Sequence, residues 1–255
     1  MTGETALNRT IFAVTGTDSL TFLQGMVSND VLPLGKASGI VWTALLTPQG
    51  KYLADFFVVK TSDALLIDIK SSIADTILRR LAMYRLRADV QITPTEMAVT
   101  RGLGPAPDTA PHSAFADPRH PALGWRGYGT AGLPPSLDWD AIRVAHTIPE
   151  TGIELIADES YLLESGFERL HGVDFRKGCY VGQEVTARMK HKTDLRKGLV
   201  QVRIVGAAPV GTPILAGGKP SGTLFTQSGD HAIAYLRFDR LDGALTAGTA
   251  TISPQ

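Results

Sequence analysis

The sequence contains a single cysteine, Cys179, among its 255 residues. One thiol excludes an internal disulfide framework, and it cannot hold an iron–sulfur cluster alone because such clusters usually need four ligands. The glycine-rich nucleotide-binding motifs, the H-E-x-x-H motif and the C-x-x-C motif are also absent from the sequence. Nucleotide and zinc chemistry therefore lack their usual anchors, and we expect no resident metal.

Excess charge and long apolar runs are missing as well. The 25 basic and 25 acidic side chains cancel, which argues against general binding of nucleic acid. No run approaches the ~18 apolar residues of a membrane span, and residues 1–10 lack the basic start and apolar block of a targeting segment. With only one cysteine, the chain is expected to be a cytoplasmic protein that binds neither nucleic acid nor membrane.

The pattern of apolar residues in the first half predicts mixed α and β structure, within two or three compact units for this length. Strands are expected at residues 40–46 and 52–60, joined by the turn Thr47-Pro48-Gln49-Gly50 into a hairpin. A third strand at 65–69 leads into a helix that begins at Ser71 or Ser72.

The second half is predicted to contain two helices and a small β-domain. One helix is expected over residues 138–146, and a stronger one begins after Asp158 or Ser160 and extends through Leu170. After Gly198 the chain changes to short β-type runs that are separated by glycine and proline. Such evenly spaced runs indicate a small β-barrel or sandwich.

The densest run of reactive side chains surrounds Cys179, in the sequence KGCYVGQE at residues 177–184. Gly178 and Gly182 bracket the thiol, and glycines allow positive φ or a close approach of the backbone to another group. Arg176 and Arg188 contribute to a cationic neighbourhood that favours the thiolate. A reactive loop is therefore expected, and a buried cysteine that packs as a small apolar residue is the alternative.

Two carboxylates stand among apolar residues and have both plain and functional interpretations. Asp55 interrupts an apolar strand, where it must face water or a partner, and simple alternation on a one-sided sheet would explain it. Glu164 lies beside the apolar side of a predicted helix, where a solvated carboxylate is the plain interpretation.

The KGCYVGQE sequence satisfies every fixed position of the pattern K-G-C-[FY]-x-G-Q-E. With this motif and the segments 16–30, 45–56, 84–90 and 163–175, nearly the whole chain resembles the YgfZ-type folate-binding proteins, which are similar in fold to the glycine-cleavage T-protein, an aminomethyltransferase. The resemblance implies an α+β ring of three domains, with two ferredoxin-like α+β units and a C-terminal β-barrel. The implied domains are residues 1–42 with 141–197, an inserted domain at 43–140, and the barrel at 198–255.

The resemblance also implies a function. Tetrahydrofolate, or a one-carbon-substituted folate, would be the cofactor, and the chain would be a monomer. It would support the synthesis or repair of iron–sulfur enzymes, a role associated with tRNA modification, and its partners would be assembly or client proteins. Cys179 would be the functional thiol, in a loop shaped by Lys177, Gly178, Tyr180, Gly182, Gln183 and Glu184. The folate would be held by Asp55 and Glu164, with Arg188 as a candidate for its anionic tail.

Two other functions remain as alternatives. A folate-dependent one-carbon transferase of the T-protein kind agrees with the implied fold, but T-proteins typically carry two adjacent acids where this chain has Ala54 before Asp55. A cysteine hydrolase would pair Cys179 with His171 or His191. The sequence shows no oxyanion-hole pattern beside either histidine, so the accessory factor without turnover is the favoured hypothesis.

Overall fold

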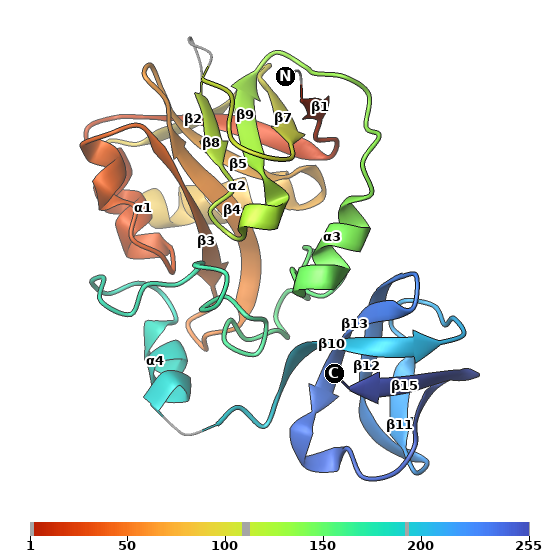
Figure 1. The fold of residues 1–255 in the computed structure, drawn as a ribbon. Helices are drawn as coiled ribbons and strands as arrows, with labels where there is room; N and C mark the ends of the chain where they lie inside the picture. The colour runs from red at the N-terminus through yellow and green to blue at the C-terminus, as the bar shows by residue number, and fades with distance from the viewer. Residues whose placement is uncertain (1–2, 109–112, 192–193, 255) are drawn as a thin grey trace. The chain divides into compact units, whose positions relative to one another are not determined.

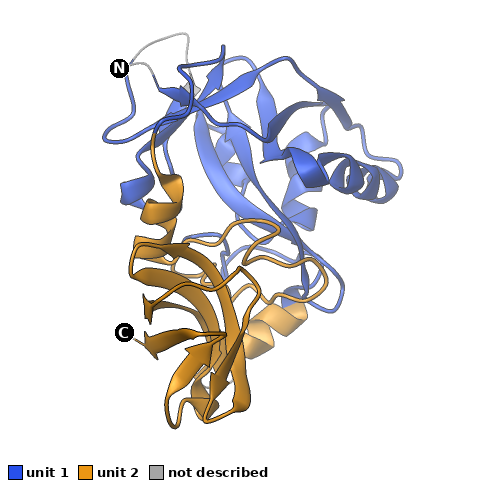
Figure 2. Ribbon diagram, turned by 90° about the vertical axis from the view of Figure 1, so that its right-hand side faces the viewer, with its two compact units in different colours: residues 1–136, 170–183 blue, residues 137–169, 184–255 orange. Residues whose placement is uncertain are grey.

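The computed structural model describes residues 3–108, 113–191 and 194–254 (Figure 1). Contacts divide the chain into two compact units (Figure 2). Unit 1 comprises residues 1–136 and 170–183, and unit 2 comprises residues 137–169 and 184–255. Both units are therefore built from segments that are distant in the sequence.

Unit 1 contains a five-stranded sheet in which all neighbours are antiparallel. Its strands in spatial order are β3 (Gly39–Leu46), β4 (Tyr52–Lys60), β5 (Leu65–Lys70), β2 (Arg9–Thr15) and β6 (Gln91–Pro94). The predicted hairpin is confirmed, with Ala44 opposite Asp55 in the register of β3 and β4. The β-branched and aromatic residues of β4 favour this pleated conformation.

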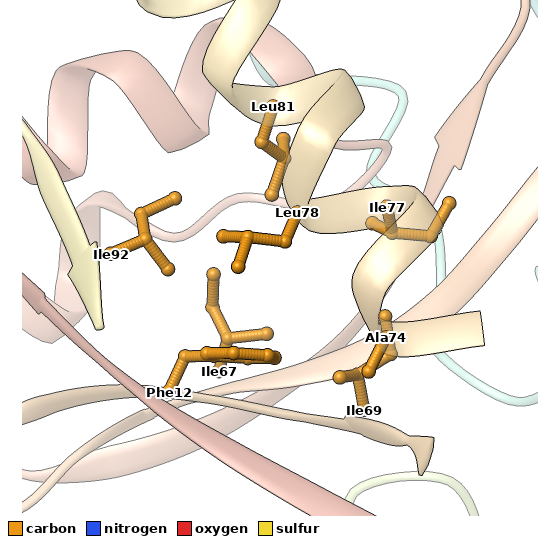
Figure 3. A pocket seen from close by; sticks show the side chains of 8 residues that line it. All are labelled: Phe12, Ile67, Ile69, Ala74, Ile77, Leu78, Leu81 and Ile92. Carbon is orange, nitrogen blue, oxygen red and sulfur yellow. The ribbon is translucent and has the colours of Figure 1, made fainter. Parts of the chain in front are cut away.

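One face of the sheet is packed against two helices, α1 (Ser19–Met26) and α2 (Ser71–Arg85), and a 3₁₀ turn, η1 (Leu32–Gly35). Side chains alternate along β4, so Ala54, Phe56 and Val58 join this apolar core. Figure 3 shows the narrow gap that remains between α2 and the sheet. Its volume is only about 10 Å³ and its lining is apolar, so the helix and the sheet are closely packed there.

The opposite face of this sheet lies against a second, four-stranded sheet in the order β1-β7-β9-β8. Its strands are β1 (Glu4–Thr5), β7 (Ala98–Gly102), β9 (Trp125–Gly129) and β8 (Ser113–Ala116), with the 3₁₀ turn η2 (Pro121–Leu123) before β9. Arg126 on β9 stacks over the ring of Phe57 on β4, 4.3 Å from its centroid. Asp55 and Phe57 therefore point away from the helices and toward a covered, polar layer.

Unit 2 begins with α3 (Trp139–His146), where Asp138 caps the first turn by accepting a 2.9 Å hydrogen bond from Ala141 N. A six-stranded antiparallel barrel follows, in the closed order β10-β13-β12-β11-β14-β15. Its strands are β10 (Lys197–Val205), β11 (Pro213–Ala216), β12 (Lys219–Ser228), β13 (His231–Arg237), β14 (Leu245–Ala247) and β15 (Ala250–Pro254), with η3 (Phe238–Arg240) after β13. The predicted helix at 138–146 and the predicted C-terminal barrel are both confirmed.

The helix predicted from Asp158 or Ser160 to Leu170 is wrong, because this stretch forms a series of turns. Phe167 N bonds to Leu162 O, five residues back, and Gly166 has φ +78°. Positive φ at Gly166 interrupts the helical hydrogen-bond ladder although the apolar spacing is helical.

Helix α4 (Gln183–His191), which was not predicted from the sequence, follows the cysteine loop. The expected boundary at residues 42 and 43 falls inside β3, and β2 shares a sheet with β5. The contacts divide the chain into two units and do not test a division into three domains. The predicted three-domain division therefore stays a prediction. Among the described residues, no helix is both long and apolar enough to cross a membrane.

Candidate functional site

Cys179 lies exposed in the loop that precedes α4. The alternative in which this cysteine packs as a small core residue is therefore wrong. Its neighbour Tyr180 is buried, and Val181 packs against the apolar core of unit 1. The thiol thus sits on a segment whose adjoining side chains are fixed in the fold.

The first anchor of this loop is Lys177, which is only 8% exposed. Its ammonium donates to Gln24 O at 2.7 Å and to Val27 O, at the C-terminal end of α1. A cation is favourable there because the last carbonyls of a helix have no intrahelical partner. Burial lowers the pKa of Lys177 to about 8, although Asp30 and Asp174 act in the opposite direction.

The second anchor is Gly182, which has φ +82°. A Cβ at this position would overlap the carbonyl oxygen of Thr47 and lie 2.9 Å from Leu46 Cβ. Glycine is therefore required both by the dihedral angle and by the close approach to the β3–β4 turn. Gly178 has no positive φ, and a Cβ there would meet nothing within 4 Å.

Sequence reasoning missed the residues that hold the segment before the loop. Ser28 Oγ donates to Gly172 O at 2.7 Å, and Ser28 O accepts from Asp174 N at 3.1 Å. Asn29 Nδ2 donates to His171 O at 2.7 Å and to Trp42 O. A Ser-Asn-Asp run is typical of a turn, but nothing in the sequence identifies a partner more than 140 residues away.

Asp55 is buried, with 7% exposed, so alternation toward water does not explain it. One carboxylate oxygen accepts from Trp42 Nε1 at 2.8 Å, and the other accepts from the hydroxyl of Tyr52 at 2.7 Å. Both partners come from the same hairpin. A carboxylate can accept about four hydrogen bonds, so these two bonds do not rule out a further contact. The predicted folate contact of Asp55 stays a prediction.

Glu164 in unit 2 is also buried, with 8% exposed, which makes the interpretation as a solvated carboxylate wrong. Its Oε2 accepts from the hydroxyl of Tyr235 at 2.6 Å and lies 3.7 Å from Lys197 Nζ. In the described part of the chain Oε1 has no hydrogen-bond partner. Burial and the bond to Glu164 raise the pKa of Tyr235, so its hydroxyl keeps its proton and donates to the carboxylate.

The remaining predicted residues lie at the surface of α4. Arg188 is exposed and approaches Glu184 at 3.9 Å, one helical turn away. In the sequence-predicted set, Asp55 and residues 177–183 belong to unit 1, whereas Glu164, Glu184 and Arg188 belong to unit 2. The structure thus brings the cysteine loop to the α1 end and the β3–β4 turn within unit 1, and Glu164 to the barrel within unit 2.

The hydrolase alternative gains no support from the geometry within unit 1. No hydrogen bond joins Cys179 to His171 in the described ranges, and the backbone of His171 is in the left-handed region, with φ +56°. No group of three His, Cys, Asp or Glu side chains that could hold a metal ion occurs among the residues described.

Comparisons with known proteins support the predicted fold. A crystal structure of the glycine cleavage system aminomethyltransferase T from Bartonella henselae matches with a TM-score of 0.70 at 11% identity, covering 96% of this chain and 82% of that one. The family model described as the CAF17 C-terminal β-barrel domain matches residues 196–255. The aminomethyltransferase-like α+β fold with a C-terminal barrel is thereby confirmed.

Relatives with higher identity carry a different name. The Mycosarcoma maydis protein named iron-sulfur cluster assembly factor IBA57 homolog, mitochondrial, is 32% identical over 81% of this chain, which spans 57% of that relative. The human iron-sulfur cluster assembly factor IBA57, mitochondrial, is 29% identical over 93% of this chain and 78% of its own length. The predicted cytoplasmic location is wrong by this comparison, since these relatives are mitochondrial. The chain is thus similar in sequence to iron–sulfur cluster assembly factors and has the fold of an aminomethyltransferase.

Proposed function

We propose that the chain is a monomeric, folate-binding accessory factor of the YgfZ type that supports assembly or repair of iron–sulfur enzymes, including enzymes of tRNA modification. The observation that carries this proposal is the similarity to the human iron-sulfur cluster assembly factor over 93% of the chain. Because the chain spans 57% of the Mycosarcoma maydis relative, its activity and partners are part of the proposal.

The geometry of the cysteine loop fits such a role. Cys179 is exposed, and Lys177 and Gly182 fix the backbone on either side. A thiolate is a soft ligand for iron, and a chain with one cysteine supplies one ligand while a partner protein supplies the rest. Cys179 would thus hold a cluster, the cargo of the reaction, only while the partner is bound.

The surroundings of Glu164 fit a reduced pterin. The ring N–H and amino groups of a pterin form a fork of donors, which a carboxylate can accept with both oxygens. Oε1 of Glu164 has no partner in the described ranges, and Tyr235 holds Oε2 in place. Folate, when bound, would supply a carrier for one-carbon units. Asp55 is proposed as a further folate contact, and Arg188 as the contact of the anionic tail.

One-carbon transfer of the T-protein kind is not favoured by any observation beyond the fold. Ala54 is fully buried in the apolar core under the helices, on the face opposite Asp55. Neighbours of Asp55 on β4 point into that core by alternation. A second acid adjacent to Asp55 would therefore be unpaired in apolar surroundings, which is costly.

The test is tetrahydrofolate binding by calorimetry, with the full chain and three variants. We expect Glu164→Gln to weaken binding by about tenfold or more, the cost of one charge-assisted hydrogen bond. Glu168→Gln is the matched control, because Glu168 is half-exposed and pairs with Lys190. Cys179→Ser should bind folate as the wild type does.

A second readout tests the role of the thiol. In cells that lack the chain, wild type and Glu168→Gln should restore the activity of an iron–sulfur enzyme, and Cys179→Ser should not. Full restoration by Cys179→Ser would contradict the proposed role of the thiol. Absence of folate binding to the wild type would remove the folate site from the proposal.

A further inference from the structure

The end of α2 exposes an unusual run of side chains, which we call the α2 tip (residues 79–87). All residues from Ala82 to Arg87 are exposed, and among them Met83 is 69%, Tyr84 40% and Leu86 87% exposed. Earlier in the same helix, Ala74, Ile77 and Leu81 are buried in the core. Large apolar side chains that gather at one exposed site mark an interaction surface.

The backbone at Leu86 strengthens this interpretation. Leu86 follows the last residue of α2 and has φ 45° and ψ −107°. Helices commonly end on a residue with positive φ, but that residue is usually glycine, because a branched side chain is strained there. A strained leucine that is almost fully exposed contributes little to folding, and such outliers occur at functional sites.

The α2 tip also carries uncompensated positive charge. Its four arginines are Arg79, Arg80, Arg85 and Arg87. Among the described residues none of them pairs with a carboxylate. Arg85 instead donates to Val90 O at 3.0 Å, and Arg79 approaches Thr76 Oγ1 at 3.5 Å. In a chain with equal numbers of acidic and basic residues, this cluster is a local positive field that attracts an acidic surface.

An open apolar hollow of about 130 Å³ lies beside the tip. Its lining consists of Phe22, Leu78, Leu81, Ala82, Arg85 and Ile92. Three of these, Leu78, Leu81 and Ile92, also line the narrow gap of Figure 3, so the hollow adjoins the packing space under α2. A cavity of about 150 Å³ accepts a benzene molecule, and this hollow therefore suits one leucine- or phenylalanine-sized side chain.

We propose that the α2 tip and this hollow dock a partner protein that inserts one large apolar side chain and surrounds it with acidic residues. The four arginines, which pair with no carboxylate in the described part of the chain, select acidic surroundings, and the size of the hollow selects a single side chain rather than a flat layer of anionic lipid. The inference rests on the proposed function for the identity of the partner, which would be the assembly or client protein.

The partner is identified first by crosslinking. The full chain, with the photoreactive amino acid p-benzoylphenylalanine at position 86, is expressed in cells that lack the native copy, and crosslinked proteins are identified by mass spectrometry. An acidic protein that is captured at position 86, but not when the probe replaces Lys219 on the barrel, is expected. Absence of any protein specific to position 86 would overturn the proposal.

The purified captured protein is then titrated with variants of the full chain. Arg79→Glu/Arg87→Glu should weaken binding by about tenfold or more, and the wild-type affinity should fall as salt is raised. Lys219→Glu/Arg240→Glu, which makes the same charge change on the barrel, is the control. Equal affinity of all variants would overturn the proposal.

Leu86→Gly separates docking from folding. Glycine relieves the positive-φ strain, so the free energy of unfolding should not fall, while partner binding weakens by about tenfold.

Binding to lipid is tested with vesicles of equal parts phosphatidylcholine and phosphatidylglycerol. If the wild type binds these vesicles and Arg79→Glu/Arg87→Glu does not, the surface would be assigned to lipid instead. All partner titrations are made without folate and without a cluster, so failure of the folate or thiol proposal is distinguishable from failure of this one.

Discussion

Asp68 in unit 1 and Glu164 in unit 2 are both buried carboxylates, but they differ in how completely their oxygens are bound. Asp68 accepts from Arg9 Nε at 2.6 Å, from an Arg126 terminal nitrogen at 2.6 Å and from the Tyr128 hydroxyl at 3.0 Å. Glu164 has bonds to Oε2 only, as far as the described residues go. A fully paired buried charge serves the fold, whereas one with an open oxygen leaves room for a ligand.

The pairing of Asp68 controls its ionisation. Burial by itself raises the pKa of the carboxyl, but Arg9 and Arg126 more than offset this, and its pKa lies below the usual value. Two arginines on one carboxylate also stack on Phe57, with Arg126 4.3 Å and Arg9 5.8 Å from the ring centroid. This cluster fixes the layer between the two sheets of unit 1, next to the strand that carries Asp55.

The largest effect should come from breaking this cluster with Asp68→Asn. The substitution keeps the shape but removes the charge of the carboxylate to which the buried guanidinium of Arg126 is bonded, which costs about 3–5 kcal/mol. Unfolding in urea is followed by tryptophan fluorescence in a Trp139→Phe background, where only Trp42 and Trp125 of unit 1 report.

Asp63→Asn is the control for Asp68→Asn, since Asp63 is exposed in the turn before β5. Its effect should stay within about 0.5 kcal/mol. If Asp68→Asn lowers the free energy of unfolding by less than about 1 kcal/mol, the cluster does not hold the layer between the sheets. Asp68 would then not serve as the structural counterpart of Glu164.

A smaller effect on stability should come from the two glycines of the cysteine loop. Like the two carboxylates, they differ in how closely their surroundings constrain them. Gly182→Ala must accept a positive φ and an overlap with Thr47 O, and we expect a loss of about 3 kcal/mol in the same urea assay. Gly178→Ala meets open space and should change stability by no more than about 0.5 kcal/mol. Equal losses for the two variants would show that Gly182 does not anchor the loop.

Much of the fold could be predicted because local patterns coincide with local structure. The β-branched and aromatic residues of β3 and β4, the helical pattern of residues 138–146 and the punctuated runs after Gly198 all predicted the observed elements. The stretch after Ser160 failed because a positive φ at Gly166 overrides helical apolar spacing. Helix α4 was missed because its exposed, charged residues give no apolar stripe.

The candidate site could be predicted as residues but not as an arrangement. The motif identified Cys179 and its loop, yet the role of Lys177 as an anchor depends on Gln24 O and Val27 O, about 150 residues earlier. The role of Asp68 could not be predicted, because its partners Arg9 and Arg126 lie 59 and 58 residues away in the sequence. Spacing reveals neighbours along one element, and contacts between distant strands leave no such trace.

The smallest effect concerns Lys177, a buried charge that is bound to carbonyl oxygens rather than to a carboxylate. Its pKa in the folded chain is lowered to about 8, mainly by burial, against about 10.4 when unfolded. Between these values the unfolded chain binds more protons, so stability rises with pH. From about pH 8 to about pH 9.5 the wild type should gain about 1.6 kcal/mol relative to Lys177→Met, somewhat less than the about 1.4 kcal/mol per pH unit of a full proton, because the folded group is already half-titrated at pH 8. Urea unfolding at both pH values measures this difference, in which the other titrating groups cancel. A difference that stays constant or falls would mean that the ammonium keeps its proton through its bonds to α1, and Lys177 would then resemble the closed cluster of Asp68.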